Sequence, residues 1–333
     1  MRTDEYPLSA AEVDDLRVVL DELGGGGLSP TDPDFYQKYR GCHELLPRGV
    51  RRFLSGFRDA EDSTACVVSG FPVDDAALGP TPGHWERADG RDATLLPDLY
   101  LAMCGWTLGE PFAWATLQCG RLVQDILPIK GDERRESGHG SEAFLSLHTD
   151  DAFRPDSPDY LLLFGLRNRD AVPTFVSALR DVRLSGSQRR VLTEPRYHIV
   201  PDHEHIRQLE QRAPGDPALL RALEMRDRPQ PVAVLFGDPD HPFIRLDTPF
   251  MSCAGEDPQA QDALSALLAE LDRVRRPLVA QPGTLLVLDN RSVVHGRDSF
   301  KARHDGTDRW LRKVIVGRRA PGSAGQPLDR VRL

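Results

Sequence analysis

One stretch of the sequence restricts the fold more than any other. In residues 144–153, FLSLHTDDAF, an apolar run ends on a histidine and a carboxylate two residues apart, His148 and Asp150. Residues i and i+2 of a β-strand project from the same face, so both side chains can bind one metal ion from one side. Asp151 would then face away and hold the end of the strand.

A second segment strengthens this interpretation. Residues 284–297 contain another apolar strand, which delivers His295 followed by Gly296. Two histidines and one carboxylate on strands form the facial triad of non-haem Fe(II) oxygenases, which leaves coordination positions open. A competing pair, His203 and His205, lies between a strand and a polar helical segment and has no comparable downstream partner. We interpret that pair as solvent-facing or as part of a lid.

Composition narrows the class of protein. With 333 residues, 40% of them hydrophobic and 28% charged, the chain can bury a large core in one elaborated domain or two. The net charge of −9 argues against a nucleic-acid partner, which would need a basic face. No apolar run reaches membrane-spanning length and no signal core begins the chain, so we expect no membrane partner and a cytoplasmic location. The five scattered cysteines are predicted to be reduced core thiols. The oligomeric state stays open.

Periodicity predicts helices outside a strand-rich core. Ser9 is the expected N-cap of the first helix. Helices are expected at 9–22, 34–57, 93–105, 180–192, 217–226 and 258–273, and strands at 65–70, 113–117, 121–128, 143–147, 160–166, 232–236, 243–247, 284–289 and 309–316. This pattern indicates an α+β fold whose core is a double-stranded β-helix, or jelly roll, with helices packed outside. We expect a single domain over 1–333: a mainly helical part at 1–110, the jelly roll with inserted helices and lid at 111–319, and a loose tail at 320–333.

Seven short motifs then point to a family. They are WAT at 114–116, GRLV at 120–123, LHTDDAF at 147–153, DYL at 159–161, LRN at 166–168, VVHGR at 293–297 and DGTDRWL at 305–311. In these motifs the chain resembles the clavaminate synthase-like Fe(II)/2-oxoglutarate-dependent oxygenases, and within them the hydroxylases of free amino acids of the viomycin-pathway arginine 3-hydroxylase type. The resemblance implies Fe(II) bound by His148, Asp150 and His295, with 2-oxoglutarate and O₂ as cosubstrates. Many members of this group have Glu in place of Asp150.

The resemblance also implies a 2-oxoglutarate site. The family's arginine lies fourteen residues after the distal histidine, which is Arg309 here, and its guanidinium suits a carboxylate. The alternative for Arg309 is a surface ion pair with a neighbouring aspartate. Thr174 is expected to share the cosubstrate carboxylate. Lys313 should point to the same face as Arg309, where related enzymes have an arginine that contacts the substrate carboxylate. Arg312 should point the other way, into solvent.

The substrate is less well defined. For an amino acid with a cationic or urea-like tail, the candidate contacts are Gln118, Glu142, Asp202 and Asp247, with Asp202 on a lid at 197–207. Arginine-type relatives are expected to have a second acid two positions after Asp247, where this chain has Pro249. We therefore predict hydroxylation at C3 or C4 of free L-arginine, citrulline, ornithine or lysine in specialised, antibiotic-type metabolism. The alternatives are desaturation of the same substrates, a His2Asp zinc hydrolase, and a non-catalytic small-molecule-binding jelly roll.

Overall fold

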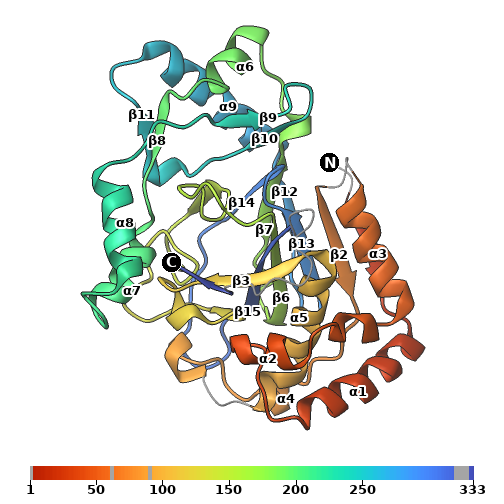
Figure 1. Cartoon of the computed structure of the whole chain (residues 1–333). Helices are drawn as coiled ribbons and strands as arrows, with labels where there is room; N and C mark the ends of the chain where they lie inside the picture. Colours follow the sequence, from red (N-terminus) through yellow and green to blue (C-terminus); the bar gives the residue numbers. More distant parts are fainter. Residues whose placement is uncertain (1–2, 61–63, 89–91, 319–329) are drawn as a thin grey trace.

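Two β-sheets that face each other form the centre of the molecule (Figure 1). The computed structural model describes residues 3–60, 64–88, 92–318 and 330–333. The larger sheet has the order β1-β2-β13-β6-β15-β3-β16, with β4 also paired to β15. Its strands are β1 (Asp4–Pro7), β2 (Ala65–Ser69), β3 (Glu110–Trp114), β4 (Gln124–Ile126), β6 (Tyr160–Arg167), β13 (Leu285–Asp289), β15 (Trp310–Gly317) and β16 (Val331–Arg332). The smaller sheet has the order β12-β7-β14-β5, with β5 (Leu145–His148), β7 (Thr174–Ala178), β12 (Arg276–Leu278) and β14 (Val293–Arg297).

The space between the sheets is apolar. Leu163 of β6 and Leu311 of β15 share one buried cluster with Val176 of β7 and Val293 of β14. Side chains from the inner faces of two sheets meet in this way in a β-sandwich, because each strand turns every second residue inward. The predicted α+β jelly roll is therefore confirmed.

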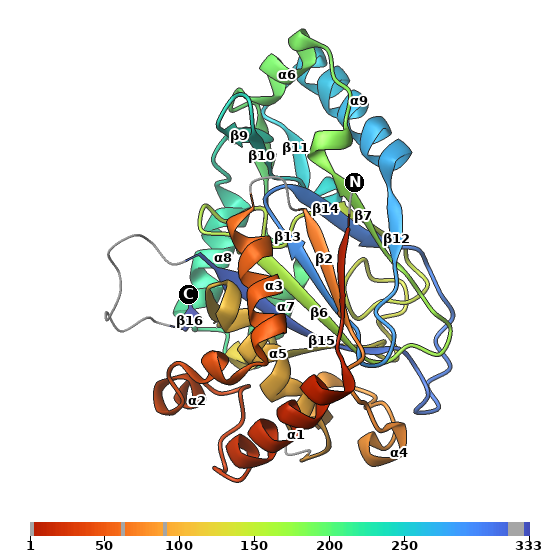
Figure 2. The same ribbon diagram turned by 90° about the vertical axis from the view of Figure 1, so that its right-hand side faces the viewer.

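Helices from the first third of the chain cover the outer face of the larger sheet (Figure 2). They are α1 (Ala10–Gly24), α2 (Pro33–Lys38), α3 (Arg48–Asp59), α4 (Asp75–Leu78) and α5 (Leu95–Leu108), with short 3-10 turns η1 (Cys42–Leu45), η2 (Trp85–Ala88) and η3 (Asp92–Thr94). Ser9 caps α1 in a capping box with Glu12, as predicted. Because both faces of the larger sheet are covered, β6 is buried along its whole length and its sequence is almost continuously apolar.

A second group of elements surrounds the smaller sheet (Figure 1). Helices α6 (Gly186–Leu192) and α9 (Pro258–Val274) pack near β7 and β14, while α7 (His203–Glu210) and α8 (Pro217–Asp227) pack against each other. The remaining elements are β8 (Tyr197–Ile199), β9 (Leu235–Gly237), β10 (Pro242–Ile244), β11 (Met251–Cys253), η4 (Gln118–Gly120), η5 (Leu179–Asp181) and η6 (Thr248–Phe250). The lid predicted at 197–207 corresponds to β8 and the first half of α7.

Several predicted elements differ from the observed ones. The helix expected at 34–57 is broken into α2, η1 and α3, because Gly41 has a left-handed backbone (φ 83°) and Pro47 precedes α3. Strands β1, β7 and β12 were not predicted. The described end of the tail is not loose, since β16 pairs in parallel with β3 and Arg330 contacts Glu110 at 2.8 Å. The rest of the predicted tail, 320–329, lies outside the described residues.

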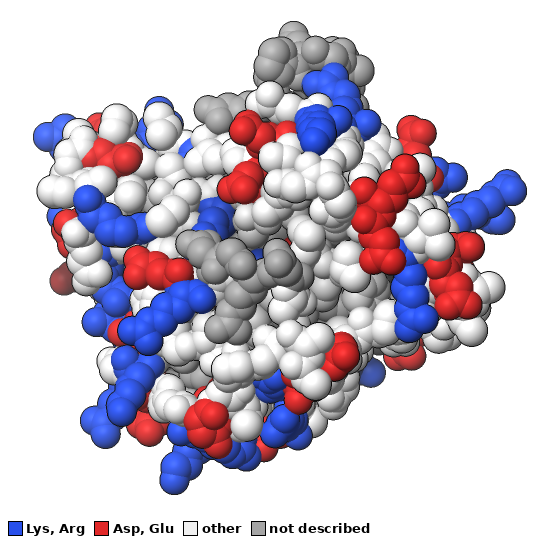
Figure 3. All heavy atoms as spheres, turned by 90° about the horizontal axis from the view of Figure 1, so that it is seen from below, with Lys and Arg blue, Asp and Glu red and all other residues white. Residues whose placement is uncertain are grey.

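Surface and thiol predictions have mixed outcomes. Cys42, Cys66 and Cys104 are buried as predicted, whereas Cys119 is exposed and Cys253 half-buried. No helix in the described part of the chain is long and apolar enough to cross a membrane. Seen from below, acidic and basic side chains alternate on the visible face, so neither sign dominates there (Figure 3).

Candidate metal centre and active site

His148, Asp150 and His295 converge at one end of the sandwich. Their candidate ligand atoms all lie within 4.8 Å of one another. Oδ1 of Asp150 is 3.5 Å from Nε2 of His148 and 3.5 Å from Nε2 of His295, and the two imidazole rings are 4.3 Å apart. A small cation could occupy the space between these three atoms.

The strands place the two histidines opposite each other. His148 ends β5, and the register of β5 with β14 pairs it directly with His295. Nδ1 of His148 lies 2.8 Å from the Ser146 carbonyl, so this nitrogen donates and Nε2 is left with a lone pair for a metal. Gly296 is required next to His295, because a Cβ there would come within 2.5 Å of the Leu145 carbonyl oxygen.

Asp150 reaches the site by a different route from the one predicted. Strand β5 ends at His148, so Asp150 lies in the following turn and not on the strand. Asn290, in the turn between β13 and β14, accepts a hydrogen bond from the Asp150 amide (2.8 Å) and donates one to its carbonyl (3.1 Å). A long-range clamp therefore replaces the strand geometry. Asn290 was not predicted, because nothing local distinguishes it from an ordinary turn asparagine.

The protonation states suit a cation site. Burial lowers the pKa of His295 to about 3, which keeps its imidazole neutral. Burial also disfavours the charged form of His148, but the hydrogen bond and charge of Asp150 raise its pKa to about 9. Despite burial, the Lys313 ammonium and both histidines hold the pKa of Asp150 well below its usual range. A metal ion would take the place of the His148 proton between the same groups.

Arg309 lies in the same pocket and is buried. It precedes β15, and its Nη2 donates a weak 3.4 Å hydrogen bond to the Thr174 hydroxyl at the start of β7. The alternative of a surface ion pair with Asp305 or Asp308 does not fit. The Asp308 carboxylate accepts hydrogen bonds from the backbone amides of Arg303 and His304. Arg309 has no carboxylate partner among the described residues. Burial, with a smaller effect of Arg297, lowers the pKa of Arg309 to about 9. An anion is needed to compensate this guanidinium.

The predicted substrate contacts separate into two groups. Asp202, Asp247 and Gln118 line the pocket, whereas Glu142 is exposed, lies outside the pocket lining and contacts Arg134 at 3.6 Å. Glu142 is therefore not placed as predicted, because its segment turns outward before β5 begins. Gln118 uses its amide in two hydrogen bonds with the Asp125 backbone, so it supports the pocket wall.

The acids that do face the pocket come from separate elements. Asp202 caps α7 through one oxygen, and Asp247, next to His148 in a backbone bridge, forms no side-chain hydrogen bond or ion pair within the described part of the chain. Burial, together with the charges of Asp202 and Glu136, raises the pKa of Asp247 to about 7. Glu136, which the sequence did not indicate, also lines the pocket and accepts a hydrogen bond from the Ser146 amide.

One further prediction about a charged residue was wrong, and one of two alternatives for a histidine is excluded. Arg312 does point away from Lys313, but it is 3% exposed and forms ion pairs with Asp98 of α5 and with Asp125, because helices cover that face of the sheet. His205, expected to face solvent or to belong to a lid, does not face solvent, although it lies on α7 within the segment predicted as a lid. It is 1% exposed and lies between the Thr116 hydroxyl (2.6 Å) and Asp151 Oδ1 (2.9 Å).

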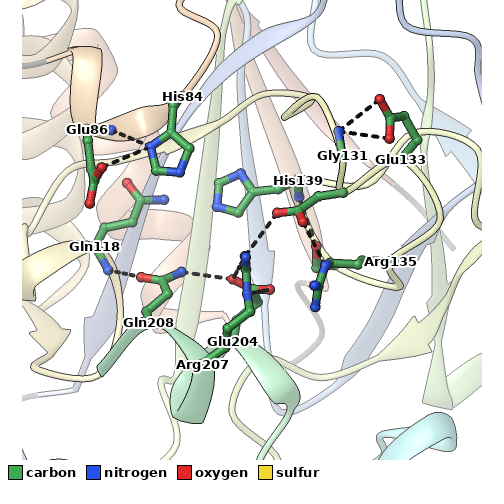
Figure 4. A network of polar contacts seen from close by, with 12 residues as sticks. His84, Glu86, Gln118, Gly131, Glu133, Arg135, His139, Glu204, Arg207 and Gln208 are labelled. Atoms are coloured by element: carbon green, nitrogen blue, oxygen red, sulfur yellow. Dashed lines mark hydrogen bonds and ion pairs between the residues drawn. The ribbon is translucent and has the colours of Figure 1, made fainter. Parts of the chain in front are cut away.

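Helix α7 and the loop before β5 form one wall of the pocket (Figure 4). Arg207 bridges Glu204 of its own helix (2.8 Å) and Asp132 of the loop (2.9 Å). Gln208 continues the network by donating to Glu204 and accepting from the Gln118 amide. This wall joins the predicted lid region to the remainder of the site through paired charges.

A jelly roll with two histidines, one carboxylate and an unpaired buried arginine in one pocket defines a non-haem iron oxygenase of the 2-oxoglutarate-dependent class. The model of the family described as Taurine catabolism dioxygenase TauD, TfdA family matches residues 120–315. The chain belongs to this family.

Individual relatives agree with this assignment. An enduracididine beta-hydroxylase from Streptomyces hygroscopicus is 39% identical over 310 residues, which cover 90% of each chain. An L-ornithine/L-arginine 3-hydroxylase from Catenulispora acidiphila is 37% identical over 297 residues, covering 86% of this chain and 87% of the relative. The crystal structure of the non-haem iron oxygenase OrfP with Fe, succinate and (3S)-hydroxy-L-Arg has a TM-score of 0.90 at 38% identity and covers 99% of both chains. The resemblance and the predicted oxygenase class are confirmed, in place of the zinc-hydrolase and non-catalytic alternatives.

Proposed function

We propose that the chain hydroxylates C3 of a free L-amino acid with a cationic side chain, arginine or a close relative of it. One observation carries the proposal. Among the described residues, a single pocket holds the His148, Asp150 and His295 triad, a buried Arg309 without a carboxylate partner, and Asp247, a carboxylate without a cationic partner. The names of the two amino acid hydroxylases above support C3 over C4. Desaturation has no separate observation in its favour.

In this proposal the triad binds Fe(II). The donor set fits that ion, since two neutral imidazoles and one carboxylate are the ligands of non-haem iron oxygenases. When bound, iron and 2-oxoglutarate supply the oxygen chemistry that cleaves an unactivated C–H bond. Thr174 and Arg309 bind the distal carboxylate of 2-oxoglutarate, because the guanidinium fork matches a carboxylate and this one is free to do so.

The protein's share of the reaction is positioning and exclusion of water. Asp247 and Asp202 face the pocket and would pair with a guanidinium or ammonium tail, whose positive charge would favour the ionised form of Asp247. Pro249 lines the same pocket but carries no charge. The tail therefore meets one acid fewer than it would if position 249 were an aspartate or glutamate. Hydroxylation at C3 requires these contacts to hold the amino acid with its C3 toward the metal.

We further propose that residues 1–333 form one domain. Strands β1 and β2 come from the mainly helical first part of the chain, yet they are members of the larger sheet beside β13. Removing residues 1–110 would therefore expose a strand edge and the apolar outer face of the sheet. Such a truncated chain is expected to be insoluble, which expression of residues 111–333 would check.

The test is release of succinate from 2-oxoglutarate with Fe(II) and O₂ in the presence of arginine, enduracididine, citrulline, ornithine or lysine. Stimulation by a cationic amino acid, with product hydroxylated at C3, is the expected result. His148→Ala should abolish it, and His241→Ala, which changes an exposed histidine outside the pocket, should not. Activity confined to neutral amino acids would contradict the proposed substrate class.

A further inference from the structure

Lys313 makes an unexpected contact at the metal site. Its ammonium Nζ lies 2.6 Å from Oδ2 of Asp150, and the two side chains are 15% and 7% exposed. Lys313 belongs to β15 of the larger sheet, whereas Asp150 follows β5 of the smaller one. This ion pair therefore joins the two sheets across the pocket.

The two oxygens of Asp150 have different surroundings. Oδ1 is 3.5 Å from Nε2 of each candidate histidine ligand, and Oδ2 is turned away toward Lys313. An ammonium is a compact point charge that can sit on one oxygen, while a guanidinium spreads its donors over a fork. A carboxylate whose second oxygen is held in this way presents only one oxygen to a metal ion.

The ammonium is charged in this environment. Its nitrogen lies at ion-pair distance from a carboxylate oxygen, the contact that an ammonium makes with a carboxylate. Asp150 is the only acid within ion-pair distance of Nζ among the described residues. Lys313 is thus committed to the candidate metal ligand, which leaves it poorly placed to act as a simple anchor for a substrate carboxylate.

We propose that Lys313 is a positioning residue for the metal, one that holds Oδ2 of Asp150 so that Oδ1 alone binds the ion. This inference rests on the proposed role of Asp150 as a ligand. It replaces the expectation, taken from related enzymes with arginine at this position, that the residue's main partner is the substrate. Asp150 and Lys313 therefore act as a pair whose ion contact spans the pocket.

The experiment compares binding of Mn(II) alone to metal-free wild-type protein and to three variants, by titration calorimetry. Lys313→Met keeps the length of the side chain and removes the charge. We expect its dissociation constant for Mn(II) to rise roughly 10- to 100-fold, the usual effect of losing a group that orients a metal ligand. Lys313→Arg, which restores a cationic donor, should recover part of the affinity. Lys301→Met, the same change at an exposed lysine outside the pocket, should bind like wild type.

Steady-state kinetics separate this role from substrate anchoring. If Lys313→Met binds Mn(II) within about twofold of wild type and only its KM for the amino acid rises, the inference is overturned and the lysine is a substrate contact. Thermal melting of the metal-free variants identifies any that fail to fold, and Lys313→Arg then serves as the informative variant. Failure of the proposed function would give a different result: the wild-type protein itself would bind no Mn(II) or release no succinate.

Discussion

At the residue scale, Arg309 shows how burial changes the meaning of a common side chain. Many arginines in the described part of the chain pair with carboxylates, as Arg303 does with Asp170 at 2.6 Å. Arg309 has the Thr174 hydroxyl instead, and its Nε has no hydrogen-bond partner among the residues that the structure describes. A buried cation in this state is costly unless an anion joins it, and a dicarboxylate cosubstrate supplies one.

The first prediction concerns this guanidinium. Arg309→Ala should raise the 2-oxoglutarate concentration for half-maximal activity by roughly 10- to 150-fold, as expected when a charged hydrogen bond of about 1.5–3 kcal/mol is lost. Arg309→Lys should fall between the alanine variant and wild type, because it keeps the charge without the fork. Succinate release against 2-oxoglutarate concentration measures both. Arg303→Ala is the matched surface control, and an effect as large there would refute the assignment.

The second prediction concerns the substrate end of the pocket. Asp247→Asn removes a buried charge with little change of shape. We expect the KM for arginine to rise about tenfold or more, since one charge-assisted contact to the tail is lost. The KM for citrulline, whose tail is neutral, should change much less. Equal effects on both amino acids would show that Asp247 supports the fold of the pocket and does not pair with the cation.

At the element scale, the turn between β13 and β14 holds the segment after β5. Asn290 satisfies the amide and carbonyl of Asp150 and also donates to the Pro158 carbonyl at 2.9 Å. Asn290→Ala leaves these buried groups unpaired, so the free energy of unfolding of the metal-free protein should fall by about 1–3 kcal/mol. Urea denaturation measures this change. Mn(II) binding should weaken in the same variant, and a variant with normal affinity would show that the clamp does not position Asp150.

A second element-scale contact joins α5 to β15. Arg312 donates two 2.7 Å hydrogen bonds to Asp98 of α5 and also contacts Asp125, to which the Trp310 indole donates at 2.6 Å. Arg312→Met would leave two buried carboxylates without their cation and should lower the free energy of unfolding by about 3–5 kcal/mol. Arg318→Met, just past the end of β15 with a side chain 42% exposed, should cost about 1 kcal/mol or less. Similar losses in the two variants would contradict this account.

At the scale of the whole molecule, the site links the two sheets. His148 and His295 come from the smaller sheet, whereas Arg309 and Lys313 lie at or on β15 of the larger one. Ligands that contact both sets should stabilise the sandwich as a unit. A single ligand at a free concentration of 100 times its dissociation constant adds about 2.7 kcal/mol to the free energy of unfolding.

The corresponding prediction is a rise in Tm when Mn(II) and 2-oxoglutarate are added together under anaerobic conditions. His148→Ala should lose the metal-dependent part of the rise, because one candidate ligand is gone. Arg309→Ala should keep the shift with Mn(II) alone and lose most of the extra shift with 2-oxoglutarate. Differential scanning fluorimetry measures all of these, and an unchanged Tm in wild-type protein would contradict the proposed site.

Local patterns explain which features could be predicted. The capping box at Ser9 depends on residues three apart, and the long apolar strands β6 and β13 are recognisable from their own composition. The candidate metal residues were found because His148 and Asp150 lie close together in sequence and His295 carries a short motif. Asn290 and Glu136 were missed, since their roles depend on neighbours that lie 140 and 10 residues away along the chain.

The sequence by itself determined the class of the fold, the identity of the candidate metal residues and the arginine expected to hold the cosubstrate, because strand periodicity and short motifs are local properties. Only the tertiary structure decided what each outward-facing residue meets. Arg312 was expected in solvent and His205 in solvent or on a lid, but α5 covers the first, and Thr116 and Asp151 enclose the second. Lys313 was expected to contact the substrate; it lines the pocket, and its ammonium contacts Asp150, which the sequence did not indicate. These outcomes depend on which distant elements pack together, and burial then sets whether a charge is paired or left for a ligand.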